Sequence, residues 1–335
     1  MLTYPSYPAT RPRRWRQSPW ARQLAAETDL LPRHLVLPII VQDSPEARQP
    51  VVSLPGVARL NLDELLREAE QAVALGIPAV ALFPAIDPTL KDATASQATD
   101  PNSLACKAIR ALRHHSPNLG VMCDVALDLY TSHGHDGLLS PCGQYVDNDA
   151  TLAVLVQQAL TYADAGATLL GPSDMMDGRI AAIRHGLEVH GHTNVLLISY
   201  AAKYHSGLYG PYRDAVGSAS HLQGASKATY QQNPANALEA ELEAMLDVAE
   251  GADALMVKPA TFYQDVIYRL RQATPLPVWA YHVSGEYAMI EAASANGWLD
   301  GERVLHEALL GLRRAGASVI LTYGALRMAR YLKTL

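Results

Sequence analysis

The 335-residue sequence predicts an α/β protein, a (β/α)8 barrel of the TIM type with an extended N-terminal arm. Eight short apolar runs alternate with amphipathic stretches after residue 33. The runs are apolar nearly throughout, which is typical of parallel strands covered by helices on both faces. The phrases AGAT, EGAD and AGAS place a glycine at the end of a helical stretch, directly before an apolar run. Eight strand–helix pairs are the number that closes a barrel.

The chain divides into an arm and one catalytic domain. Residues 1–33 are rich in proline, arginine and aromatic side chains and form little core, so we expect an arm for contacts between subunits. Residues 34–335 are expected to form a single barrel. We predict that the Gly-, Ser- and Tyr-rich connection at about 204–233 is an active-site lid, because long loops in compact domains often cover sites. The expected strands are 34–41, 79–85, 120–127, 168–174, 194–203, 254–260, 276–284 and 318–324, and the clearest helices are 62–76, 151–167 and 237–253.

Composition narrows the cellular setting. The net charge of -6 and the pI near 6.0 argue against nucleic acid as a partner. No apolar run reaches the roughly 18 residues that span a bilayer, so no membrane partner is expected. The three cysteines form no CxxC pair or disulfide framework, which fits the reducing cytoplasm. The arginines of the N-terminus leave a targeting peptide or a nucleic-acid arm as alternatives to a subunit contact.

Two lysines end apolar runs that are neighbours in the predicted barrel. Lys203 ends the fifth run and Lys258 lies near the end of the sixth, so both are expected at the mouth where barrel enzymes place their chemistry. Burial and a second cation both lower the pKa of a lysine, and the free amine then attacks a ketone to form a Schiff base. The alternative for each lysine is an ordinary solvated or salt-bridged residue at a strand end.

Further polar residues suggest what this amine would act on. Arg213 and Lys227 on the lid, with Ser284 and Tyr323 at strand ends, are suited to hold carboxylates, which predicts small keto acids as substrates. Two other functions remain open. A class I aldolase or decarboxylase would use Lys258 alone, and a catalytically silent barrel would serve as a regulatory oligomer.

Six long motifs follow one another along the chain: YTSHGHDG (130–137), GPSDMMDGRI (171–180), SYAAKY (199–204), YGPYRDAVGS (209–218), MVKPA (256–260) and HVSGEYAMI (282–290). In this order they resemble the porphobilinogen synthase (5-aminolevulinate dehydratase) family, and the resemblance runs from about the RPRRWR segment to the C-terminus. It implies a TIM barrel that condenses two 5-aminolevulinate molecules to porphobilinogen with loss of two waters, in tetrapyrrole (heme) biosynthesis. It also implies a homo-octamer assembled through the arms, sometimes interconverting with a hexamer.

The resemblance assigns catalytic roles to residues near the mouth. Lys258 and Lys203 resemble the two lysines that form Schiff bases, and Lys258 corresponds to the one that forms the stable imine with the first substrate. Asp124 and Ser173 resemble the polar partners near these lysines, where a proton can be moved. The resemblance implies no organic cofactor.

It also assigns seven residues to substrate binding. Two hold the carboxylate of the first substrate, three hold that of the second, and two are aromatic lid residues beside the second pocket. One of the three is a lysine where some members have arginine, so the charge is kept but the bidentate fork is lost. In that order the residues are Ser284 and Tyr323; Arg213, Lys227 and Gln231; Tyr209 and Tyr212.

The metal sites of the family are changed here. Zinc-dependent members carry three cysteines at the positions of Ala126, Asp128 and Asp136, so we expect no zinc of that three-cysteine type and a member of the zinc-independent, aspartate-type branch. Whether Asp128 and Asp136 hold magnesium, potassium or only water stays open. His133 and His135 could ligate zinc beside Asp136, although we prefer the interpretation that they shape a turn.

A second metal position lies on the acidic helical stretch before Lys258. Glu243 resembles the glutamate that binds an allosteric magnesium, mostly through water, near a subunit interface. The alternative is that Glu243 belongs to the solvated face of an acidic helix, because Glu239, Glu241 and Glu250 lie on the same stretch.

Overall fold

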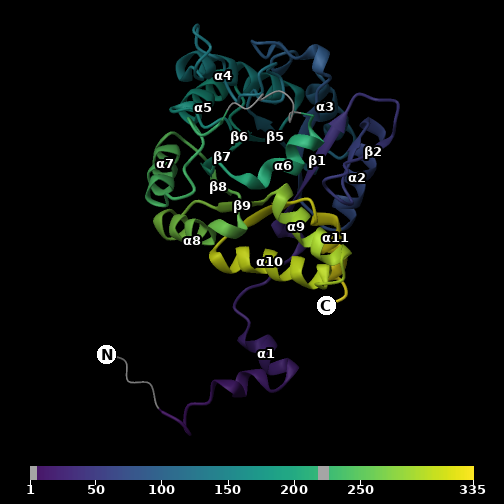
Figure 1. The fold of residues 1–335 in the computed structure, drawn as a ribbon, viewed down its shortest axis with the longest axis vertical. Helices are drawn as coiled ribbons and strands as arrows, with labels where there is room; N and C mark the ends of the chain where they lie inside the picture. The colour runs from purple at the N-terminus through teal and green to yellow at the C-terminus, as the bar shows by residue number, and fades with distance from the viewer. Residues whose placement is uncertain (1–5, 218–225) are drawn as a thin grey trace.

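Eight parallel strands form a closed barrel in the computed structural model, which describes residues 6–217 and 226–335. Each strand pairs with its neighbours in chain order, and β1 closes the ring by pairing with β10 through Leu35–Ile320 and Val36–Leu321. The predicted (β/α)8 barrel is therefore confirmed, with all eight expected strands present (Figure 1). The barrel strands are β1 (Leu35–Gln42), β4 (Ala79–Ala85), β5 (Gly120–Val125), β6 (Leu169–Pro172), β7 (Leu196–Lys203), β8 (Ala254–Lys258), β9 (Val278–His282) and β10 (Val319–Thr322).

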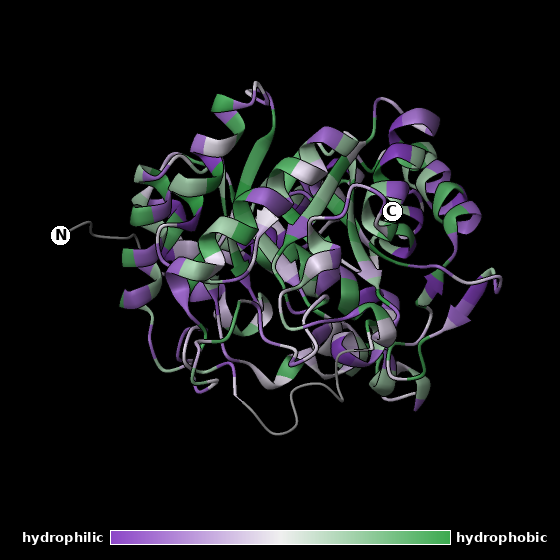
Figure 2. Ribbon diagram, turned by 90° about the horizontal axis from the view of Figure 1, so that it is seen from above, coloured by the Kyte–Doolittle hydropathy of each residue, from purple (hydrophilic) through white to green (hydrophobic). Residues whose placement is uncertain are grey.

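Helices surround the barrel and cover its outer face, while the strands are apolar and central (Figure 2). Every residue of β1, β8 and β9 is buried, which explains why these strands show no polar alternation in the sequence. The surrounding helices are α2 (Leu62–Ala74), α3 (Leu104–His115), α4 (Asn148–Ala165), α5 (Arg179–Val189), α7 (Leu238–Ala249), α8 (Gln264–Ala273), α9 (Ser284–Ala295), α10 (Gly301–Ala315) and α11 (Ala325–Leu332). Short 3-10 turns are η1 (Pro12–Arg16), η2 (Pro32–His34), η3 (Pro88–Leu90), η4 (Ser96–Ala98), η5 (Gly207–Tyr209) and η6 (Thr261–Tyr263).

Local sequence signals set the helix ends. The side chain of Asn61 accepts a hydrogen bond from the backbone N–H of Glu64 and caps the start of α2. Gly166 ends α4 with a φ of 106°, and Gly316 ends α10 with a φ of 117°. Both glycines adopt the left-handed conformation that residues with a Cβ rarely enter, so each helix stops and the next strand begins at once.

Two features differ from the expected outline. A small hairpin of β2 (Arg48–Pro50) and β3 (Ala58–Leu60) extends the sheet beside β1, and its three-residue strands are too short to give a sequence pattern. The predicted lid contains the turn η5 and the helix α6 (Gly210–Ala215) rather than a structureless loop. Residues 218–225 of the lid lie outside the described residues.

The described part of the N-terminal arm projects away from the barrel and carries η1 and the helix α1 (Pro19–Ala25) (Figure 1). No helix within the described ranges combines the length and the apolar character needed to cross a membrane.

Candidate active site

Lys203 and Lys258 lie side by side at the carboxyl ends of β7 and β8, where the register pairs one directly with the other. Both side chains are buried, with residue exposures of 4% and 6%. The parallel barrel forces this arrangement, because adjacent strands that end at the same level bring their last residues together.

Aromatic rings surround the amine of Lys258. Its Nζ lies 4.8 Å from the ring centroid of Tyr281, 5.1 Å from that of Tyr200, and 5.4 Å from those of Tyr209 and Tyr212. Burial, and then the neighbouring charge of Lys203, lower the pKa of Lys258 to about 8. A substantial fraction of Lys258 is therefore an unprotonated amine just above neutral pH, which is the form that attacks a carbonyl.

The environment of Lys203 is different. Its Nζ donates a hydrogen bond to Oδ1 of Asp136 at 2.9 Å and another to the backbone carbonyl of Ser173. Because a carboxylate pairs with Lys203, while aromatic rings surround Lys258, the two amines are chemically unequal.

Asp136 lies between two lysines and is completely buried. It pairs with Lys203 at 2.9 Å and with Lys227 at 2.7 Å, and the hydroxyl of Tyr230 donates to it at 2.9 Å. Burial would raise the pKa of Asp136, but the charges of Lys203 and Lys227 outweigh it and hold the pKa well below its usual range. Lys227 also pairs with Asp128 at 3.0 Å. Both aspartates that were considered as metal ligands are thus ion-paired with Lys227.

Asp124 lies near the end of β5, and its carboxyl group interacts with the charges of Lys258 and Lys203. Its Oδ2 accepts a hydrogen bond from the Ser173 hydroxyl at 3.0 Å. Burial raises the pKa of Asp124 to about 6, against the opposing charges of Lys258 and Lys203. Asp124 can therefore take up and release a proton near neutral pH.

One cavity brings most of the predicted site together. It contains both lysines, the acidic and hydroxyl partners, and the lid residues expected to bind the second substrate. The lining residues are Asp124, Asp128, Ser173, Lys203, Tyr209, Tyr212, Arg213, Lys227, Gln231 and Lys258.

Ser284 and Tyr323, expected to hold the first carboxylate, lie outside the lining of this cavity. The Ser284 hydroxyl accepts a hydrogen bond from the backbone N–H of Tyr212 at 3.0 Å and so fastens α6 to the start of α9. The hydroxyl of Tyr323 is 3.4 Å from that of Tyr281, and Tyr323 lines a separate cleft of about 440 Å³ beside α11.

The candidate metal residues make hydrogen bonds within the protein. Within residues 6–217 and 226–335, no group of three or more His, Cys, Asp or Glu side chains is arranged to hold a metal ion. The backbone N–H of His135 donates to Nδ1 of His133 at 3.3 Å, and Nδ1 of His135 is 3.1 Å from the hydroxyl of Tyr230. The first contact is local, as expected of a turn, whereas the second joins His135 to a residue of the predicted lid. Cys123, on β5, is a free and buried cysteine.

Glu243 is half-buried on α7 and lies outside the lining of the lysine cavity. Burial raises its pKa, Arg179 opposes the rise, and the nearby carboxylates of Asp247 and Asp177 add to it. Glu243 therefore has both carboxylates and a guanidinium near it.

Sequence reasoning missed three tyrosines of the site. Tyr200 and Tyr281 face Lys258 from within apolar strands, and Tyr230 bonds both Asp136 and His135. In the sequence they are indistinguishable from core aromatics. The only available signal is the composition. The chain has 16 tyrosines and two phenylalanines, so most of its phenyl rings carry a hydroxyl group that apolar packing does not require.

A (β/α)8 barrel with two buried lysines at its mouth, an acid beside them and cations on a lid has the arrangement of a barrel enzyme, in which the chemistry lies at the carboxyl ends of the strands. The chain belongs to the delta-aminolevulinic acid dehydratase family, which residues 9–331 match.

Close relatives cover nearly the whole chain. The delta-aminolevulinic acid dehydratase of Bradyrhizobium diazoefficiens is 51% identical over 97% of this chain and 92% of its own length. That of Mycobacterium tuberculosis is 47% identical over 99% of this chain and 100% of its own length. Among solved structures, the porphobilinogen synthase of Toxoplasma gondii in complex with the reaction product porphobilinogen is 43% identical, with a TM-score of 0.95 over 97% of this chain and 92% of that one.

We expect Asp136→Asn to destabilise the protein by about 3–5 kcal/mol, because it leaves two buried ammonium groups without their shared carboxylate. Asp128→Asn is the matched control and should cost less, since Asp128 pairs with one lysine only and its side chain is 11% exposed. Urea unfolding measures both. Equal losses, or none for Asp136→Asn, would contradict the central role of this carboxylate.

Proposed function

We propose that this chain condenses two molecules of 5-aminolevulinate into porphobilinogen, with loss of two waters, through Schiff bases on Lys258 and Lys203. The observation that carries the proposal is the register pairing of these lysines inside one cavity with a lowered Lys258 pKa. The family membership supports the same reaction.

The unequal environments give the lysines different tasks. Lys258, with its pKa of about 8, supplies an uncharged amine for the ketone of the first substrate. Lys203 keeps a carboxylate partner, and its amine becomes reactive when it loses a proton. Asp124 is the better acceptor for that proton, because its pKa is about 6 whereas that of Asp136 is held low. Holding both substrates in one cavity replaces a bimolecular encounter with an intramolecular one, which lowers the barrier for forming the C–C and C–N bonds.

The second substrate is oriented by the lid side of the cavity. Arg213, Lys227 and Gln231 line it and present cationic and amide groups. Lys227 forms an ion pair with Asp128 at 3.0 Å, so a substrate carboxylate would compete with Asp128 for Lys227. The turn η5 and the helix α6 contribute Tyr209, Tyr212 and Arg213 to the lining, and enclosure of a bound substrate by these residues would exclude water and so strengthen the interactions.

Borohydride trapping tests the Schiff bases. With 5-aminolevulinate, we expect a reduced adduct on the peptide containing Lys258, with a trapping rate that rises with pH through about 8 as the amine loses its proton. Lys258→Met should lose both the adduct and product formation. Lys203→Met should lose product formation and move the trapping midpoint to higher pH, because a neighbouring cation is gone. The surface variant Lys107→Met is the control.

Other outcomes identify the other functions. Substantial turnover by Lys203→Met would indicate an aldolase or decarboxylase that uses Lys258 alone. An unlabelled wild-type protein would favour a catalytically silent barrel.

We also propose that Glu243 binds a regulatory magnesium ion. The support is that the carboxylates of Asp247, Asp177 and Glu239 lie near enough to Glu243 to affect its pKa, and carboxylate oxygens are ligands that magnesium prefers. With few side-chain ligands nearby, the ion would keep several waters, as magnesium commonly does. Bound there, it would neutralise charge at α7.

Magnesium titration tests this site. Chelated protein should bind magnesium in calorimetry and gain activity several-fold on its return, while zinc or potassium should not replace it. Glu243→Gln should lose the binding heat and the activation. Glu241→Gln, on the same helix but paired with Arg269 at 2.9 Å, should keep both. Magnesium binding that persists in Glu243→Gln would place the ion elsewhere.

We also propose that the chain assembles into a homo-octamer, with a hexamer as the alternative form, and that it works in the cytoplasm. The arm supports the proposed assembly. Three large apolar side chains of the arm are exposed: Trp15 is 56% exposed, Trp20 65% and Leu24 73%. Such a set on a projecting segment is typical of a subunit contact.

Deleting residues 1–25 should leave a folded barrel but a smaller assembly, measured by light scattering after gel filtration. Trp20→Ala should weaken the assembly as well. Trp298→Ala, which removes a tryptophan exposed on the barrel side, should not. A truncated protein of unchanged assembly size would contradict the role of the arm.

A further inference from the structure

Two polar atoms near Lys258 are buried without a hydrogen-bond partner among the described residues: Oη of Tyr200 and Oδ1 of Asp124. Tyr200 is completely buried on β7. Burial, and then the nearby charge of Asp124, hold the pKa of its phenol well above the usual value. Leaving a buried polar group without a hydrogen bond costs about 1–3 kcal/mol of stability. A donor and an acceptor that are both unpaired, and that interact electrostatically, therefore point to a hydrogen bond that forms during the reaction.

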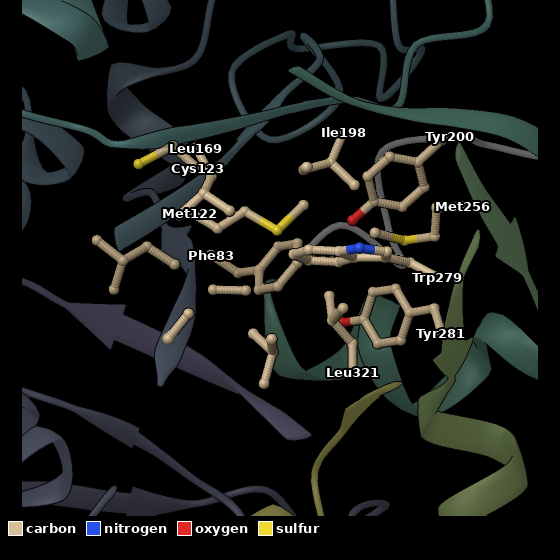
Figure 3. Packing of buried hydrophobic residues seen from close by; sticks show 14 of the residues in the cluster. Phe83, Met122, Cys123, Leu169, Ile198, Tyr200, Met256, Trp279, Tyr281 and Leu321 are labelled. Carbon is tan, nitrogen blue, oxygen red and sulfur yellow. The ribbon is translucent and has the colours of Figure 1, made fainter. Parts of the chain in front are cut away.

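The position of Tyr200 relative to the amine is fixed by packing. Its ring centroid lies 5.1 Å from Nζ of Lys258, and Figure 3 shows Tyr200 and Tyr281 within the buried cluster, from β7 and β9. The two hydroxyls have different neighbours, because that of Tyr281 lies 3.4 Å from the hydroxyl of Tyr323. Tyr200 alone of this pair presents an open hydroxyl near Asp124.

We propose that Tyr200 is a positioning residue for Asp124: its hydroxyl donates to Oδ1 when Asp124 gives up a proton during Schiff-base formation at Lys258. The Ser173 hydroxyl already donates to Oδ2 at 3.0 Å, so the two donors together would hold both carboxylate oxygens. This inference rests on the proposed function.

The step balances as follows. The Lys258 amine adds to the ketone carbon, and a proton moves from nitrogen to oxygen to give a carbinolamine. The C–O bond then breaks while protonated Asp124 transfers its proton to the departing hydroxyl, which leaves as water. The products are a protonated imine and the Asp124 carboxylate, and the Tyr200 hydroxyl stabilises that carboxylate while keeping its own proton.

Other groups around Asp124 also influence its protonation. Two lysines on adjacent strands favour the carboxylate, and a carboxylate and two phenols besides Tyr200 lie near enough to interact. These groups are Lys258 on β8, Lys203 on β7, Asp128 after β5, Tyr212 on α6 and Tyr323 after β10. Tyr200 differs from them in having a donor that is both fully buried and unpaired among the described residues, so removing only its hydroxyl isolates its contribution.

Tyr200→Phe keeps the ring beside Lys258 and removes the hydroxyl. We expect kcat to fall about 10- to 100-fold, the range for losing one hydrogen bond to a charged group, with little change in KM. The limb at which kcat falls as pH rises past the pKa of Asp124 should move to higher pH, because Asp124 acts as the acid and a carboxylate that loses a donor has a higher pKa. Tyr281→Phe is the matched control and should leave that limb in place. In an Asp124→Asn background, Tyr200→Phe should cost little more.

Stability separates this role from a structural one. The Tyr200 hydroxyl has no partner among the described residues, so Tyr200→Phe should unfold at the wild-type temperature or above it. Loss of folding, an unmoved pH limb, or an equal shift in Tyr281→Phe would overturn the proposal. If wild-type protein forms porphobilinogen while Tyr200→Phe behaves identically, this inference fails alone. If wild-type protein forms none, the proposed function fails.

Discussion

The mouth of the barrel depends on the ion pairs of Asp136 with Lys203 and Lys227. Removing these charges from water is expensive, and mutual attraction offsets the cost only when each charge has a partner. Asp128 also pairs with Lys227, which therefore has two carboxylate partners. Within the described residues, Lys258 is then the buried lysine that faces aromatic rings instead of a carboxylate. Burial without a carboxylate partner, together with the neighbouring charge of Lys203, therefore lowers the pKa of Lys258.

This arrangement also links the lid to the chemistry. Lys227 and Tyr230 belong to the lid connection, yet both contact Asp136 in the barrel. Any displacement of the lid would weaken the contacts that hold Asp136, the carboxylate partner of Lys203. It would also alter the electrostatic environment of Lys258. Substrate entry and the protonation of the lysines are thus connected by direct contacts, with no long pathway between them.

The sequence predicted the eight strands because each is a continuous apolar run, and it predicted the cavity because strand ends meet at one mouth. It could not predict that Lys227 pairs with Asp128 and Asp136, since about 90 residues or more separate these partners and no local pattern connects them. Tyr200 was missed for a related reason: a tyrosine in an apolar strand is normally a core residue, and only three-dimensional packing shows that its hydroxyl is open. The three-residue strands β2 and β3 lack enough residues for any periodicity.

Barrel closure has a consequence for how the enzyme is made. Because Val36 pairs with Leu321, the ring cannot shut until almost the last strand has left the ribosome. Until then the edges of β1 and of the newest strand expose unpaired backbone groups, which invite association with other chains. Synthesis of this protein therefore includes a long interval in which the edges of an incomplete sheet must be shielded from other chains. Slow translation or scarce chaperones would reduce the yield of folded protein, independently of the active-site residues.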